Sequence, residues 1–422
     1  MKKVKALLCC LLAFLTLSGC ASMLEGEYTS VRQPDTALSD EENPFPVIHA
    51  ETYEEILDAL MTMIRTGEEF GVIRITTYEG DVVTAVNDAC MEITNNTPLG
   101  SYAVYYLTGT VNRIISYYDA EINITYKRTL LELANITSVT SLRTLDSELR
   151  YYMGVNSSRE TISVNFPEVT PEYISRRIGE LYYEDPSLCS VLPSVSVEEY
   201  PPGGDERILD LTFRYPYTVA RVTDMQEKIL NAADELAASV EGLQKGEAVL
   251  RLCETLAATV EYDLEREQTG GTDFHLSDTA FGALIDGKAS GLGFAMATKL
   301  LCDKLGVECV VVQGRRDSMD HGWNIICLDG DYYHVDASVF TQVGAENAYL
   351  IGDTWMSDRC WWDQTLYPAC NGPLAYGDFA PAAAMATPAP TPAPTSAPSE
   401  AVSTPAPEAA QAPEESAPIP EE

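Results

Sequence analysis

The chain has 422 residues, of which 64 are acidic and 27 are basic, and its formal net charge is −37 at pH 7. Such an excess of negative charge argues against binding to nucleic acid, and against binding to anionic lipid through a basic surface. The acidity predicts a solvated, self-repelling surface. No segment has the alternating Asp/Asn ladder of an EF-hand loop, so we expect neither a metal nor a cofactor.

The first twenty residues have the pattern of an export signal. Lys2, Lys3 and Lys5 precede an apolar run, and small residues then lead to Cys20. This ending resembles the lipobox of bacterial lipoproteins, which implies removal of residues 1–19 and acylation of Cys20. The apolar run is shorter than the roughly 20 residues that a spanning helix needs. We therefore expect an extracytoplasmic protein that is lipid-anchored to a bacterial cell membrane, the alternative being an uncleaved membrane anchor.

Two polar segments flank the body of the chain. Residues 20–45 are acidic with little periodicity, which predicts a tether between the lipidated Cys20 and the first folded domain. Residues 379–422 consist mainly of Pro, Ala, Thr, Ser and Glu, with no basic residue. This composition cannot bury a core and predicts a disordered tail, either a spacer or a segment lying in the cell wall.

Residues 46–138 and 139–222 share a weak internal repeat. In each, a polar cap precedes a helical apolar pattern, which is followed by a strand, a second helix, a proline and an alternating strand. The matching segments are 52–60 with 141–149, 70–75 with 161–166, 82–94 with 170–183, and 122–127 with 209–214. We predict two duplicated small α/β modules of helix, strand, helix and hairpin. Neither contains a nucleophile, base or metal cluster, so both are interpreted as binding or spacer modules.

A third domain is predicted over residues 223–378, where the pattern changes. Two long helices are followed by an apolar segment, a helix after the Gly287 turn and three strands, at 223–240, 245–260, 279–285, 291–305, 307–313, 322–328 and 331–336. Helices followed by an antiparallel sheet are typical of an α+β fold.

Cysteine spacing gives little information on metals or disulfides. The cysteines of the body form no CxxC pair, and several lie in apolar runs typical of buried small side chains. Cys360 and Cys370 flank a short Trp-rich loop, where a disulfide is possible in an extracytoplasmic protein. Spacing alone leaves that pairing open.

Short motifs occur in a specific order within residues 261–370. They are Glu261-Tyr-Asp263, Thr279-Ala-Phe-Gly-Ala-Leu284, Asp286-Gly-Lys-Ala289, Gly293-Phe-Ala295, Leu305-Gly-Val307, His321-Gly-Trp-Asn324, Asp329-Gly-Asp-Tyr-Tyr-His-Val-Asp336, Trp361-Trp-Asp363 and Tyr367-Pro-Ala-Cys370. This order resembles the transglutaminase-like domain of the papain-like cysteine protease superfamily, in the branch common in bacterial surface proteins. The resemblance implies a papain-like α+β fold here and says little about residues 46–222.

The resemblance also implies roles for individual residues. Such a site needs a thiolate at a helix N-terminus, an imidazole as proton partner and a carboxylate that orients the imidazole. His321 matches the base and Asp336 the orienting carboxylate, but the nucleophile position falls on Gly291, which has no side chain to attack with. Ser290 points about 100° away along the helix start and Cys302 lies roughly 16 Å further along the axis, so neither is a credible replacement.

Other residues around the motifs have two interpretations each. Trp323, Asn324 and Ser290 are expected to line a binding cleft, although Trp323 and the neighbouring aromatic residues are also typical of a core. The pair of His321 and Asp336 is equally compatible with a buried hydrogen bond that only stabilises the sheet. His275 and His334 have no partner pattern, so we interpret them as structural or exposed.

The first functional hypothesis is a cell-surface lipoprotein whose transglutaminase-like domain is a catalytically inactive pseudoenzyme. In it, the glycine leaves a cleft open at the helix N-terminus, where N–H groups receive a carboxylate or a carbonyl of a peptide, protein or cell-wall ligand. The second is an active thiol protease, amide hydrolase or protein crosslinker with Cys302 or Cys309 as nucleophile. The third is a purely structural surface spacer.

Overall fold

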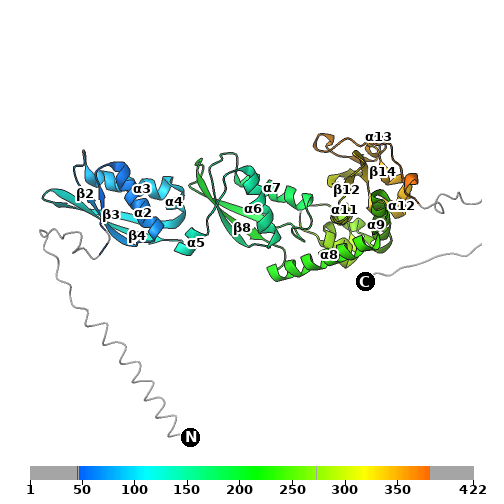
Figure 1. Cartoon of the computed structure of the whole chain (residues 1–422), viewed down its shortest axis with the longest axis horizontal. Coiled ribbons are helices and arrows are strands. Elements are labelled where there is room, and N and C mark those ends of the chain that lie inside the picture. The colour runs from blue at the N-terminus through cyan, green and yellow to red at the C-terminus, as the bar shows by residue number, and fades with distance from the viewer. Residues whose placement is uncertain (1–44, 46, 272, 381–422) are drawn as a thin grey trace, which may run out of the picture.

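The computed structural model describes residues 45, 47–271 and 273–380. These residues form three units that follow one another in a row in chain order (Figure 1). The predicted export signal, Cys20 and almost all of the predicted tail lie outside the described residues. Within the described ranges, no helix is both long enough and apolar enough to cross a membrane.

The first unit is a four-stranded sheet with its helices packed on one face. It begins with a parallel edge strand that the sequence did not predict, and Thr52 and Glu55 then form a capping box at the start of the first helix. The elements are β1 (Val47–Ala50), α2 (Tyr53–Thr66), β2 (Phe70–Ile75), α3 (Val82–Asn96), α4 (Pro98–Ala103), β3 (Val104–Ile114) and β4 (Tyr117–Tyr126). The strand order is β1-β2-β4-β3.

The second unit has the same order of pairing. Its elements are α5 (Leu130–Ala134), β5 (Thr137–Ser138), α6 (Leu142–Gly154), β6 (Arg159–Val164), α7 (Pro171–Glu184), β7 (Ser194–Tyr200) and β8 (Arg207–Arg214), with strand order β5-β6-β8-β7. In both units the first strand is parallel to the second and the last two form an antiparallel hairpin. The predicted succession of helix, strand, helix and hairpin is therefore present in each.

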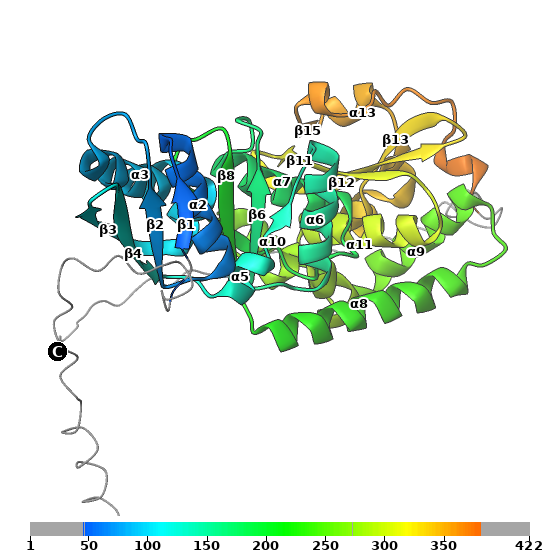
Figure 2. The same ribbon diagram turned by 60° about the vertical axis from the view of Figure 1, so that its left-hand side comes forward.

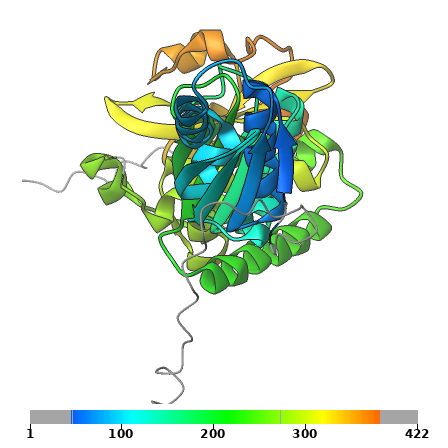
Figure 3. The same ribbon diagram turned by 90° about the vertical axis from the view of Figure 1, so that its left-hand side faces the viewer.

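Specific polar contacts join the first unit to the second. Tyr102 of α4 contacts Thr161 through its hydroxyl at 3.2 Å, and its ring packs edge-on against Tyr200. Arg128 donates a hydrogen bond to Asp210 at 3.0 Å, and Asp210 also binds Arg159. These contacts place the two sheets one behind the other, as the end-on view in Figure 3 shows.

The third unit contains two long helices, a central helix and a five-stranded antiparallel sheet. Its main elements are α8 (Val219–Ser239), α9 (Lys245–Thr259), β9 (Glu261–Tyr262), α10 (Leu264–Thr269), β10 (Lys288–Ala289), α11 (Gly291–Lys304), β11 (Cys309–Arg316), β12 (Met319–Leu328), β13 (Asp331–Val335), α12 (Phe340–Val343), β14 (Tyr349–Ile351), α13 (Asp353–Ser357) and β15 (Cys360–Trp361). The sheet order is β14-β13-β12-β11-β15. This mixture of helices and an antiparallel sheet agrees with the predicted α+β class.

Two elements differ from the sequence-based expectation. The helix predicted from residue 223 begins at Val219, because the Thr218 side chain caps it by accepting the N–H of Arg221. The apolar segment predicted at 279–285 is a single π-helical turn, Gly282–Asp286, and it ends at Gly287, whose φ of 75° suits glycine.

The second and third units share one hydrophobic core, whereas the first unit has a core of its own. Leu181 of α7 and Ile229 of α8 belong to the same cluster as Phe294 of α11. Figure 2 shows α8 running beneath both units. A shared core fixes the second unit against the third, so any site between them has a defined geometry.

Candidate functional site

The N-terminus of α11 lies at the centre of the candidate site. Ser290 is its N-cap: the hydroxyl oxygen accepts the N–H of Gly293 and donates to Asp278 at 2.7 Å. Its side chain is therefore committed to capping the helix and to Asp278. Gly291, the first residue of the helix, has no left-handed backbone angle, so its conformation would suit any L-residue.

The structure brings the predicted base and carboxylate together. His321 on β12 is 4% exposed, and its Nε2 lies 2.9 Å from Oδ2 of Asp336, the residue that follows β13. Asp336 also accepts a hydrogen bond from the Ser338 hydroxyl at 2.6 Å. The imidazole ring is thus oriented by a fully hydrogen-bonded carboxylate.

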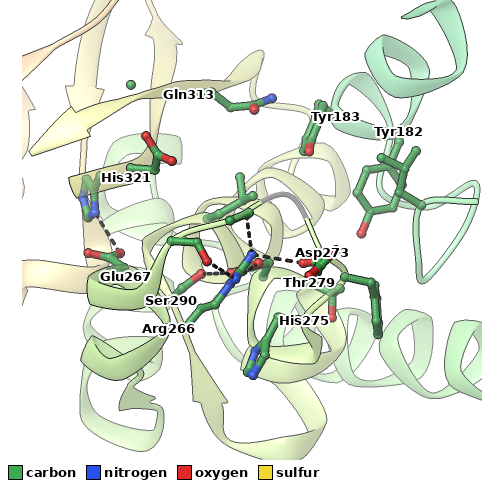
Figure 4. Close-up of a pocket in the computed structure, with 18 of the residues that line it drawn as sticks. Tyr182, Tyr183, Arg266, Glu267, Asp273, His275, Thr279, Ser290, Gln313 and His321 are labelled. Atoms are coloured by element: carbon green, nitrogen blue, oxygen red, sulfur yellow. Dashed lines mark hydrogen bonds and ion pairs between the residues drawn. The ribbon is translucent and has the colours of Figure 1, made fainter. Parts of the chain in front are cut away.

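A second carboxylate, which the sequence analysis missed, occupies the other side of the imidazole. Oε1 of Glu267, from the short helix α10, lies 3.0 Å from Nδ1 of His321 and accepts the N–H of Gly291 at 2.7 Å. The hydroxyl of Tyr262 donates to its other oxygen. Figure 4 shows Glu267 and His321 facing one another. The carboxylate thus makes the two contacts that the site chemistry requires of a thiolate, one to the imidazole and one to the helix N-terminus.

The space for a nucleophile side chain is filled. A Cβ atom added to Gly291 would lie 2.4 Å from Nδ1 and Cε1 of His321 and 2.7 Å from Oε1 of Glu267. The expectation of an open cleft at the helix N-terminus is therefore wrong at this position, because side chains of the same chain occupy it.

The two carboxylates determine the charge of His321. Burial by itself would lower its pKa, but the attraction of Asp336 and Glu267 and their hydrogen bonds outweigh burial and raise the pKa to about 9. Burial acts to raise the pKa of each carboxyl, yet the interactions with His321 hold both below their ordinary values. At neutral pH the group is an imidazolium between two carboxylates, and an imidazolium cannot accept a proton as a general base.

This ionisation makes the stability of the fold depend on pH. A histidine whose pKa is raised on folding stabilises the fold fully below its unfolded value and loses that effect as the pH rises through its folded value. For His321 the loss falls between about pH 6.5 and about 9 and is on the order of 3 kcal/mol. The depressed carboxyls act in the opposite direction, and their stabilisation is lost only in acid.

Urea unfolding across this range checks the prediction. The free energy of unfolding of the unmodified protein, minus that of a His321→Gln variant, is expected to decrease steadily from mildly acidic to alkaline pH. A difference that does not change with pH would show that His321 is uncharged in the folded state.

The structure places two predicted cleft residues in the core. Trp323 and Asn324 are each 1% exposed. The Trp323 indole N–H donates to Nδ1 of His334 at 2.9 Å, and the Asn324 side-chain amide donates to the carbonyl of Ala295 at 2.9 Å. Neither can touch a ligand, whereas Ser290 does line a cavity beside the site.

A cluster of His334, Asp353 and Cys370 has the residue types of a metal site, with ligand atoms within 4.8 Å of one another. The Trp323 N–H occupies the lone pair of Nδ1, so the proton of His334 lies on Nε2 and points at Asp353, 2.9 Å away. A metal at Nε2 would require loss of that proton and formation of an imidazolate. The cluster is therefore explained as a structural hydrogen-bonded chain, in which burial lowers the pKa of His334.

Four cysteines of the third unit, Cys302, Cys309, Cys360 and Cys370, offer no alternative nucleophile. Cys302 is 1% exposed and Cys309 5%, and burial raises the pKa of Cys309 well above its ordinary value. Cys360 and Cys370 are buried free thiols in this structure, and burial raises the pKa of each to about 12. None of these thiols is an exposed thiolate.

A cleft of about 880 Å³ opens beside the closed site, between α7 of the second unit and the third unit. Glu267 and His321 line one side of it, and Tyr182 and Tyr183 of α7 line the other (Figure 4). Trp361 also lines it and is 66% exposed. The volume lies in the range of roughly 300–1,000 Å³ that is usual for small-ligand sites.

Comparisons with known proteins give only distant structural similarity. No protein family model matches the chain, and no curated protein matches it. One similar solved structure is a TGase, with 12% identity, a TM-score of 0.26, and coverage of 53% of this chain and 65% of the TGase. Another is a protein assigned as a cysteine protease from Cytophaga hutchinsonii, with 12% identity, a TM-score of 0.23, and coverage of 41% of this chain and 68% of that one. These similarities carry no argument about chemistry, so the chemistry of the site is derived from its own residues.

Proposed function

We propose that this protein is a cell-surface lipoprotein, anchored through Cys20, whose transglutaminase-like domain is a pseudoenzyme that binds a peptide, protein or cell-wall ligand. The observation that carries the proposal is the carboxylate of Glu267, held on the N–H of Gly291 and on His321. The negative carboxylate beside the positive imidazolium has the same charges as a thiolate–imidazolium pair. Its oxygens are already hydrogen-bonded to Gly291, His321 and Tyr262.

Three requirements of thiol catalysis are absent from this arrangement. Gly291 supplies no nucleophile, and the raised pKa of His321 leaves it protonated at neutral pH. The N–H of Gly291, a helix N-terminal donor of the kind that stabilises an oxyanion, already donates to Glu267. The glycine at position 291 and the carboxylate of Glu267 together account for all three, as expected of a pseudoenzyme.

A binding role is favoured over a mere spacer by the cleft. The second and third units build it together over a shared core, so it has a fixed shape. We further propose that the first two units are duplicated modules that hold this cleft away from the membrane, in line with their identical strand order.

The enzyme alternative needs a reactive thiol, and iodoacetamide labelling of the folded protein tests it. We expect Cys302 and Cys309 to remain unlabelled until the protein is unfolded in urea, because both side chains are buried. The mature protein is also expected to release no ammonia from casein and to incorporate no amine into it. Activity that iodoacetamide abolishes would contradict the pseudoenzyme proposal and support an active thiol enzyme.

A further inference from the structure

The cleft is lined by a largely buried tyrosine whose hydroxyl has no hydrogen-bond partner in the described residues. Tyr182 on α7 is 3% exposed and lines the cleft, and Figure 4 shows its ring, with that of Tyr183, reaching toward it. Within the described residues, the Tyr182 hydroxyl makes no hydrogen bond to the protein. The hydroxyl oxygen is open to the cleft, so it is available as a hydrogen-bonding group for a ligand.

The charged groups of the cleft are largely neutralised already. Arg266 donates to Asp278 at 2.8 Å and to backbone carbonyls of the loop that follows, and Arg315 pairs with Asp320 at 3.2 Å. Glu267 is held by His321. Asp273 is the lining carboxylate for which the described residues provide no ion pair. The groups that remain for recognition are mostly neutral donors and acceptors, such as the Tyr182 and Tyr183 hydroxyls and the exposed amide of Gln313.

Aromatic faces accompany these neutral groups. Trp361 is 66% exposed and Phe274 is 40% exposed, and both line the cleft. The face of an aromatic ring carries partial negative charge, so it packs well against C–H bonds with partial positive charge. Pyranose rings present such C–H faces together with a rim of hydroxyl groups. The C–H faces match the aromatic rings of the cleft, and the hydroxyl groups match its neutral hydrogen-bonding groups.

An extended peptide fits this cleft less well. Such a peptide usually binds by pairing with a free strand edge. At the cleft, the edge of β11 is already used: Arg315 and Arg316 pair with β15, and the N–H of Gln313 donates to the Tyr367 hydroxyl at 3.3 Å. A ligand here must be recognised by side chains and aromatic faces.

We infer that the cleft binds an uncharged oligosaccharide. The inference rests on the proposed binding function of the same cleft and names its ligand class. Tyr182 and Tyr183 supply hydrogen bonds from the second unit, and Trp361 supplies a stacking face from the third unit.

Titration calorimetry with chitotetraose, an uncharged tetrasaccharide, tests the inference on the mature protein. We expect saturable binding that Tyr182→Phe weakens about 5- to 10-fold, because the substitution removes one hydrogen bond and leaves the ring in place. Trp361→Ala should weaken binding at least as much. Tyr106→Phe, at an exposed position on β3 of the first unit, is the matched control and should leave the affinity within about 2-fold.

A tetra-alanine peptide provides the second arm. If the peptide binds with the same dependence on Tyr182 and the saccharide does not, the saccharide inference is overturned and the binding cleft stands. If chitotetraose binds but Tyr182→Phe and Trp361→Ala leave its affinity unchanged, the inference is also overturned, because the ligand then lies elsewhere. If neither probe binds, the saccharide inference fails and the proposed binding function loses its main support.

Discussion

Substitution of Gly291 by cysteine alone is expected to produce no amide hydrolysis and no amine transfer, although it places a thiol at the position that the sequence resemblance assigns to the nucleophile. The added Cβ would lie 2.4 Å from the His321 ring and 2.7 Å from Glu267. These distances are too short, so the ring or the carboxylate must move. The thiol would also have to displace a carboxylate from the Gly291 N–H and from the imidazole.

Removal of the carboxylate in the same protein is expected to change this result. In a Gly291→Cys/Glu267→Ala variant, the space of the Glu267 side chain becomes available to Sγ, and His321 loses one of the two groups that keep it protonated. Asp336 stays in place to orient the ring. We expect thiol-dependent release of ammonia from casein, or incorporation of a primary amine, in the double variant only.

Two controls make this comparison specific. A triple variant with His321→Ala in addition should be inactive, and iodoacetamide should abolish the activity of the double variant. Activity in the unmodified protein, or equal activity in the single and double cysteine variants, would mean that Glu267 does not close the site.

The second large effect is on stability. Glu267→Ala is expected to lower the free energy of unfolding by about 1.5–3 kcal/mol, because it removes a buried charged partner of His321 and of the Gly291 N–H, while Asp336 remains on the ring. The side chain of Glu267 is 5% exposed and that of His321 is fully buried. Urea unfolding at neutral pH measures the loss.

Glu265→Ala is the matched control for this substitution. It makes the same chemical change two residues away on α10, at an exposed position, and should cost no more than about 0.5 kcal/mol. An equal effect of the two substitutions would show that Glu267 only contributes to the helix and does not stabilise the imidazolium.

The two predictions are linked through a double-mutant cycle. Gly291→Cys should destabilise the unmodified protein, since it overpacks the site, and should destabilise the Glu267→Ala background less, because the overlap with the carboxylate is then gone and only that with the His321 ring remains. Additive effects would contradict the view that the carboxylate stands where a thiolate would stand.

The sequence predicted those parts of the site that depend on local order. Gly291 at a helix start, His321 in a strand and Asp336 at a strand end were all identified, and the structure brings them together. Glu267 was missed because it lies in a six-residue helix that contains two acidic residues with no apolar periodicity. Only the tertiary approach of α10 to α11 determines which carboxylate turns inward.

Trp323 and Asn324 show a different limit. In a strand with one solvated face, alternation separates the core side from the exposed side. In β12, residues 321 to 326 are all buried, so both faces of the strand are covered and alternation cannot distinguish a cleft wall from the core. The motif therefore located the strand correctly but not the environment of each side chain.

In the first two units, the helices and hairpins were predictable because their patterns are long and periodic. The edge strands β1 and β5 were not, since they contain four and two residues. Their pairing depends on neighbouring strands more than on their own sequence. The cleft was equally beyond prediction, because α7 and the third unit supply its walls from segments far apart in the chain.

The most direct test of the central claim is the ionisation of His321, followed by NMR of the labelled imidazole groups as a function of pH. The chain has four histidines, so the spectrum of a His321→Gln variant assigns the signal. The structure predicts an imidazolium at neutral pH that titrates near pH 9, and a lower pKa in Glu267→Gln. A neutral imidazole with a pKa near the ordinary value of about 6.5 would contradict the account, because His321 would then be free to act as a base.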